Sequence, residues 1–130
     1  MVNEVKGVKI VGGVRFDFEK LIVYNKSIDF VDKIFRFCDG LPYLLQSSIG
    51  DQLRRASLSI VNNIAEGSDK LSSKDKKRFF LYSLDSAREC IPVLSICRRR
   101  NLISGNEEDS FREECKVICR MLNKSVHSVK

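Results

Sequence analysis

The sequence has little of what interrupts helices and little of what performs catalysis. Two prolines and seven glycines occur in 130 residues, and Gly7, Gly12 and Gly13 lie close to the N-terminus. Most of the chain is therefore free of helix breakers. There is one histidine, His127, and no phosphate-binding glycine loop, zinc-protease motif or nucleophile elbow. We therefore expect neither an enzyme nor a cofactor.

Long apolar runs are also missing, and the cysteines are too few and too scattered for a disulfide scaffold. No run approaches the roughly 20 residues that span a bilayer, so we expect no membrane contact. The five cysteines are an odd number, and no signal-peptide pattern precedes them. We expect a cytoplasmic protein. Cys115 and Cys119 lie one helical turn apart, but a four-ligand site needs two more groups, so we expect core cysteines and no metal.

What the sequence does have is the composition of one folded domain with a basic balance. Hydrophobic residues make up 43% and charged residues 31% of the chain, proportions that are typical of globular proteins. Lysine and arginine number 23 against 17 acidic residues, for a net charge of +6. That excess suits contact with a polyanion, but it also suits a protein that is merely basic.

Apolar side chains recur at spacings of three and four in four segments, the pattern of amphipathic helices. We predict helices at about 17–38, 48–66, 73–100 and 107–128. Three short links make neighbouring helices antiparallel, so the predicted fold is all-α, an antiparallel up-down-up-down four-helix bundle over residues 17–130. Residues 1–16 are expected to be an N-terminal arm, either a short strand or a mobile segment.

Capping and breaking residues mark the ends of these helices. Asp17, Ser48, Ser72 and Asn106 are the predicted caps of the four starts. Gly67 is expected to end the second helix in a left-handed conformation. A breaker cluster ends the first helix near residue 40, and the proline at position 92 should kink or divide the third.

The first helix carries more apolar side chains than one packing face can use. Its main stripe comprises Phe18, Leu21, Ile28, Val31, Phe35 and Cys38. A second apolar group lies off that stripe: Ile22, Val23, Tyr24, Phe30, Ile34 and Phe37. A helix that is apolar most of the way round needs burial on more than one side. We interpret the second group as a subunit interface, and the alternative is that this helix is simply central in the bundle.

A polar line runs along the second helix beside its apolar stripe. It comprises Gln52, Arg55, Ser59, Asn63 and Glu66. Buried polar groups need partners, and the antiparallel third helix offers Ser86 and Glu89 on one face. We predict a structural polar network that fixes helix register, with an Arg55–Glu89 ion pair. The less favoured alternative is a ligand or catalytic site, because these residues include no evident nucleophile–base pair.

The same segment carries a resemblance to a known family. Gln52, Leu53, Arg54, Arg55, Ala56, Ser59, Ile60, Asn63, Ile64, Ala65, Glu66 and Gly67 match a signature of four-helix-bundle proteins encoded by intervening sequences in bacterial 23S ribosomal RNA genes. The similarity extends over roughly residues 16–128, with Tyr24 where the family usually has tryptophan, Ser83 where it has alanine and Asp85 where it has glycine. The resemblance implies a four-helix bundle, often a ring-shaped homopentamer. It also implies kinship with the accessory proteins of diversity-generating retroelements, basic bundles that bind nucleic acid and a reverse transcriptase.

Basic residues gather at one end of the predicted bundle, where the first helix starts, the fourth ends and the second joins the third. This basic rim comprises Arg15, Lys20, Lys70, Lys74, Lys76, Lys77, Arg78, Arg120, Lys124 and Lys130. The fourth helix adds a basic ridge at four-residue steps: Arg112, Lys116, Arg120 and Lys124. Apart from Arg15 and Lys130, these are the candidate nucleic-acid-binding residues. The alternative for the ridge is ordinary surface ion pairing and complementation of the helix dipole.

Two functions remain open at this point. The first is an oligomeric protein that binds RNA or DNA through phosphate contacts, indifferent to sequence, with a nucleic-acid enzyme as a possible partner. No aromatic interleaving predicts a stacking platform for single strands. The second is an oligomeric scaffold or protein-interaction module whose basic charge is incidental.

Overall fold

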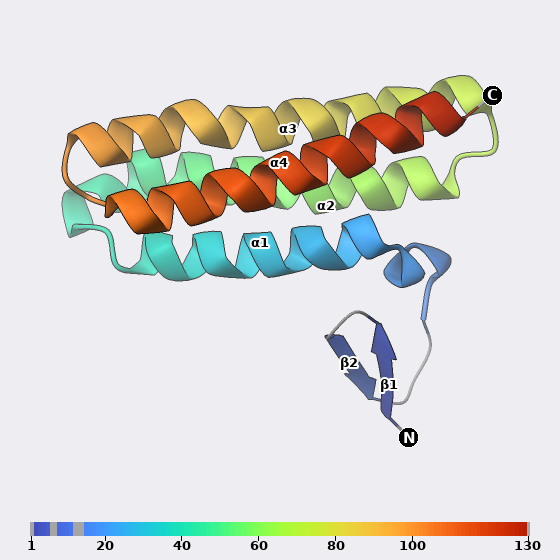
Figure 1. Ribbon diagram of the computed structural model, residues 1–130, viewed down its shortest axis with the longest axis horizontal. Helices are drawn as coiled ribbons and strands as arrows, with labels where there is room; N and C mark the ends of the chain where they lie inside the picture. The colour runs from blue at the N-terminus through green and yellow to red at the C-terminus, as the bar shows by residue number, and fades with distance from the viewer. Residues whose placement is uncertain (1, 6–7, 12–14, 130) are drawn as a thin grey trace.

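Four long helices pack side by side in an antiparallel bundle (Figure 1). The structure, a computed structural model, describes residues 2–5, 8–11 and 15–129. The helices are α1 (Ile22–Asp39), α2 (Asp51–Asp69), α3 (Ser73–Arg99) and α4 (Gly105–Ser128). Each packs against its neighbours in chain order, and α4 returns beside α1. The predicted all-α, up-down-up-down four-helix bundle is therefore confirmed. Within the described ranges, none of the helices combines the length and apolarity needed to cross a bilayer.

A small hairpin precedes the bundle. Its strands β1 (Val2–Val5) and β2 (Val8–Val11) are antiparallel, with Val2 opposite Val11 and Val5 opposite Val8. The hairpin lies outside the bundle, near the start of α1 (Figure 1). Of the two interpretations of residues 1–16, the described part of this segment adopts the strand.

The first two helices begin differently from the prediction. A short 3-10 turn, η1 (Asp17–Lys20), is separated from α1 by Leu21 in an extended conformation, with no side-chain cap. The link to α2 contains a 3-10 turn, η2 (Tyr43–Leu45), and a π-helical turn, η3 (Gln46–Gly50). Asp17 caps neither η1 nor α1, and η3 runs directly into α2 without a side-chain cap. The predicted caps at Asp17 and Ser48 are therefore wrong.

The last two helices begin with serine caps. The Ser72 hydroxyl accepts from the Asp75 N–H at 3.1 Å, as predicted. At α4 the cap is Ser104, which accepts from the Glu107 N–H at 3.1 Å, so the Asn106 cap was misplaced by two residues. The proline inside α3 does not divide it, since the helix continues to Arg99.

Gly67 lies inside α2 and does not end it. The helix runs two residues further, to Asp69. A Cβ at position 67 would come within 2.9 Å of the Phe80 ring and 3.1 Å of the Phe79 Cβ. The glycine is therefore needed for close approach of α2 and α3, and the predicted role as a helix cap is wrong.

The core confirms the apolar stripes of α2, α3 and α4. Leu53, Ile60 and Ile64 of α2 are completely buried, and so are Leu94 of α3 and Leu122 of α4. These side chains belong to one continuous cluster along the bundle axis.

The stripe predicted for the first helix is partly wrong. Phe30 and Ile34, predicted as a subunit interface, are completely buried in the core, and Val23 joins them. Phe35, predicted as core, is only half-buried. The extended residue at Leu21 separates Phe18 from the helical register of α1, and within the helix only Val31 and Cys38 of the predicted stripe are buried. Most of the group predicted as an interface therefore packs in the core, whereas Ile22 remains 39% exposed.

Candidate nucleic-acid interface

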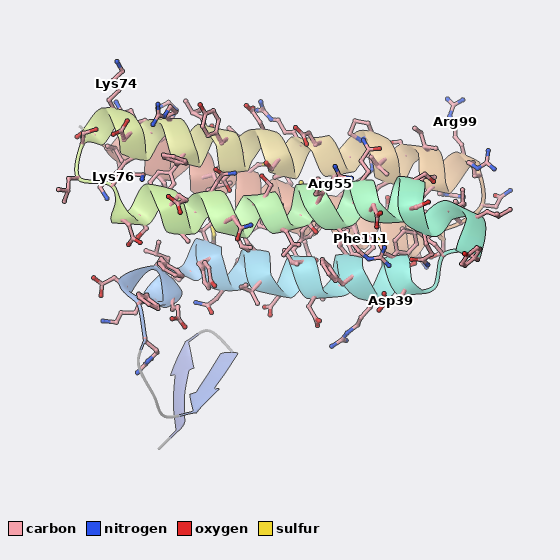
Figure 2. The ribbon with its side chains drawn as sticks, turned by 180° about the vertical axis from the view of Figure 1, so that it is seen from behind. Asp39, Arg55, Lys74, Lys76, Arg99 and Phe111 are labelled. Atoms are coloured by element: carbon pink, nitrogen blue, oxygen red, sulfur yellow. The ribbon has the colours of Figure 1, made fainter. Side chains whose placement is uncertain are left out.

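The basic rim forms at one end of the bundle, as antiparallel packing requires. The start of α1, the α2–α3 link and the end of α4 lie together there (Figure 1). Figure 2 shows Lys74 and Lys76 at this end and Arg99 at the opposite end. Lys130, also predicted for this end, is outside the described residues.

Several rim cations are already occupied within the protein. Lys70 pairs with Glu66 at 3.4 Å, and Arg78 pairs with Asp75 at 3.2 Å. The Lys76 Nζ donates to the Ser68 carbonyl at 2.9 Å, where it satisfies the end of α2. Lys20 lies 3.7 Å from Asp17. These exposed pairs are weak and can exchange for a phosphate, whereas Lys76 has a structural role.

Other basic residues are unengaged. Among the described residues, no ion pair or hydrogen bond reaches the side chains of Lys74, Lys77, Lys116, Arg120 and Lys124. Lys20 and Lys124 line one shallow depression between α1 and α4, and Arg120 and Lys124 line the next. Nearby Asp17, Glu66 and Asp75 each pair with another cation. The unengaged basic side chains therefore leave an excess of positive charge at this end of the bundle.

Arg112 does not take part in the basic ridge. Its Nε donates to Glu108 at 3.1 Å, and its guanidinium also donates to the Ser95 hydroxyl at 2.7 Å. Arg98 lies 3.9 Å from the same Glu108 carboxylate, which is buried. The charges of Arg98, Arg112 and Glu108 thus partly cancel at the end of the bundle opposite the basic rim. The ridge is reduced to Lys116, Arg120 and Lys124.

An aromatic pair that was not predicted from the sequence adjoins the basic rim. The rings of Phe79 and Tyr82 meet edge to face with centroids 5.7 Å apart, and Tyr82 is 47% exposed. Lys70 Nζ lies 5.0 Å and the Arg78 guanidinium 5.2 Å from the Phe79 ring centroid. Aromatic and basic side chains therefore lie together at this end, and Lys70 reaches Phe79 through the fold rather than along the chain.

Three members of the predicted polar network are joined by hydrogen bonds. The Ser86 hydroxyl of α3 donates to the Ser59 hydroxyl of α2 at 2.8 Å. The Asn63 amide donates to the same hydroxyl at 3.0 Å and to the Ser59 carbonyl at 2.8 Å. Ser83, which was not in the predicted network, donates to the Ile60 carbonyl at 2.7 Å. These bonds fix the relative position of α2 and α3.

The other predicted members do not join this network. Glu66 pairs with Lys70. Arg55 and Glu89 line one groove between α2 and α3, yet no ion pair connects them, so that predicted bond is wrong. Gln52 lines the same groove without a hydrogen bond to another described residue. The groove is also lined by Ser48 and by the small side chains Ala56 and Ser59.

Four of the cysteines are buried, in keeping with the expected core role. Burial raises the pKa of the Cys38 thiol to about 11 and that of Cys90 to about 12. The neighbouring Cys115 thiol, together with the Arg88 guanidinium, lowers the pKa of the half-buried Cys119 to about 7. Within the described ranges no group of three potential ligands is placed to hold a metal ion.

Cys119 should therefore be the first thiol that iodoacetamide alkylates. Its rate should rise between about pH 6 and about pH 8 as the thiolate forms and then level off, whereas an ordinary thiol of pKa about 8.5 is still gaining thiolate at pH 8. Arg88→Gln should raise this pKa and slow labelling near neutrality. Peptide mass spectrometry of the native protein measures both, with full denaturation as the control for all five cysteines. Equal labelling of Cys90 and Cys119 in the native protein would contradict the expectation.

Known proteins similar to this chain share its fold. A family model described as 23S rRNA-intervening sequence protein matches residues 19–124. Among solved structures, a protein of unknown function from the S23 ribosomal protein family of Bacteroides thetaiotaomicron is 22% identical. Its alignment covers 82% of this chain and 96% of that one, with a TM-score of 0.74. No curated protein matches the chain in sequence.

Proposed function

This chain belongs to the 23S rRNA-intervening sequence protein family, and from its basic rim we propose that it is a non-enzymatic protein that binds RNA or DNA through phosphate contacts. The observation that carries the proposal is the set of unengaged cations at one end: Lys74, Lys77, Arg120 and Lys124. Phosphate oxygens are the natural partners of such groups, since binding them releases condensed counterions.

We further propose that the protein is cytoplasmic and forms a homo-oligomer. In the pentameric ring that the family resemblance implies, several copies of the basic rim would lie on one face and their fields would add. A nucleic-acid enzyme is a further proposed partner, which the bound strand would bring close.

The test is a salt-titrated binding assay on the intact protein. Fluorescence anisotropy with labelled RNA and DNA, from about 50 to about 200 mM salt, should show affinity that falls linearly on a log–log plot. Several phosphate contacts predict a loss of at least about tenfold over this range. A similar slope for unrelated sequences would support phosphate recognition. Affinity that does not change with salt, or no binding at the lowest salt, would refute the proposal.

A second candidate function, a protein-interaction module, is favoured by the other end of the bundle. Tyr43 and Leu44 in the α1–α2 link are 90% and 85% exposed. Adjacent large apolar side chains this exposed are typical of contact surfaces. The two functions differ in their salt response, because apolar docking at Tyr43 and Leu44 persists where phosphate contacts are screened.

A further inference from the structure

The open groove between α2 and α3 combines unused hydrogen-bonding groups of opposite charge. Its volume is about 600 Å³, and it is lined by Ser48, Gln52, Arg55, Ala56, Ser59 and Glu89. Arg55 supplies only donors and Glu89 only acceptors when charged. Figure 2 shows Arg55 on the side of α2 that faces α3. A ligand that fills this space must therefore present acceptors on one edge and donors on another.

Neither charged group is compensated by the protein itself. Ser59 is occupied by Ser86 and Asn63, whereas Arg55 and Glu89 form no ion pair with a described residue. The related position Arg54 is instead bonded to Gln46 at 2.7 Å and Asp39 at 3.2 Å. Of two adjacent arginines, one is thus built into the fold and the other is left facing the groove.

We propose that this groove binds an unpaired guanine base of a nucleic-acid strand held on the basic rim. Guanine presents two acceptors, O6 and N7, to which an arginine binds through two parallel bonds. Its adjacent edge carries the N1–H and N2–H donors, which a carboxylate accepts in the same paired way. Adenine replaces the O6 acceptor with an amino donor, and the pyrimidines lack N7. The proposal rests on the proposed function, because the strand is held by the basic rim.

A continuous path connects the basic rim to the groove. Tyr82 lies one helical turn from Ser86, on the side toward the rim, and Glu89 lies about one turn on the other side. At about 1.5 Å per residue, Tyr82 and Glu89 are separated by about 10 Å along α3. The exposed Tyr82 ring, with Phe79 and its two cations, offers a stacking surface between the phosphate-binding end and the groove. A single strand can therefore cross from one to the other.

The experiment compares short labelled oligouridines by fluorescence anisotropy with the intact protein. One strand is uridine only, and the others carry one central guanosine, inosine or 7-deazaguanosine. Inosine lacks the N2 amino group, and 7-deazaguanosine lacks the N7 acceptor. The variants are Arg55→Gln and Glu89→Gln, and the matched controls are Arg88→Gln and Asp85→Asn, which make the same charge changes at exposed positions of α3.

The guanosine strand should bind about tenfold more tightly than oligouridine. Glu89→Gln should make guanosine and inosine equal, and Arg55→Gln should make guanosine and 7-deazaguanosine equal. Both variants should keep oligouridine affinity within about twofold of their matched controls. The controls should retain the full preference for guanosine.

Equal affinity of the wild type for guanosine and uridine strands would overturn the inference while leaving the proposed function intact. A guanosine preference that survives in both variants would also overturn it. Absence of salt-sensitive binding to every strand would remove the proposed function and this inference together. If sedimentation shows that Arg55→Gln and Glu89→Gln dissociate the oligomer, the groove is a contact between subunits and the base-binding proposal fails.

Discussion

Replacing Phe30 with alanine should lower the free energy of unfolding by about 3–5 kcal/mol. The Phe30 side chain is completely buried and meets Phe111 edge to face, with ring centroids 6.0 Å apart. The substitution removes apolar surface from the core and leaves a cavity that the helices around it can close only in part. Urea denaturation followed by circular dichroism measures the loss, at several protein concentrations because an oligomer's stability depends on concentration.

Phe35→Ala is the matched control. It deletes the same atoms from the same helix, but Phe35 is only half-buried, so a loss of about 1 kcal/mol is expected. Comparing the two variants distinguishes two orientations of α1. In the observed packing Phe30 is the core residue, whereas the stripe predicted from residue spacing makes Phe35 the core residue. If Phe35→Ala proved more destabilising than Phe30→Ala, the orientation of α1 in the bundle would be wrong.

Neutralising the unengaged cations of the basic rim should lower nucleic-acid affinity by about 100-fold at about 100 mM salt. The variant replaces four side chains with glutamine: Lys74, Lys77, Arg120 and Lys124. Each phosphate contact contributes about 0.9 to the slope of log affinity against log salt for duplex DNA, so the slope should fall by as much as about 3.6. None of the four side chains is engaged within the described structure, and the fold should be unaffected.

A variant with the same change in net charge serves as the control: Arg36, Arg88, Arg99 and Arg100 replaced with glutamine. These side chains are exposed and lie away from the basic rim. Long-range electrostatics should lower the affinity of this control only slightly, because most of its charges are separated from the rim by more than a Debye length of about 10 Å. Equal losses in the two variants would show that net charge, and no particular surface, attracts the polyanion.

Local features of the chain were predictable where one segment alone decides them. The stripe of Leu53, Ile60 and Ile64 has a single apolar face, so its spacing identifies the buried side of α2. Ser72 caps α3 because its hydroxyl and the Asp75 N–H are only three residues apart. The basic rim follows from the order of four helices and three short links, which brings its members to one end.

Features of the candidate site that span two segments were not predictable in the same way. The helical periodicity of α2 and α3 places Ser59 and Ser86 on facing sides, and the structure contains a hydrogen bond between their hydroxyls. It places Arg55 and Glu89 on facing sides too, but they line an open groove and form no ion pair. Residue type and face cannot distinguish these cases, because separation across helices depends on the volume of the side chains between them.

The sequence by itself determined the four helices, their antiparallel order, the apolar faces of three of them and the end of the bundle where positive charge collects. The tertiary structure alone decided which side of α1 is buried, why Gly67 must be small, and which cations remain free. The physical reason is the distance along the chain over which each interaction acts. Helical periodicity and capping act within one or two turns, whereas Phe30 against Phe111 and Lys70 against Phe79 are contacts whose existence depends on how whole helices pack.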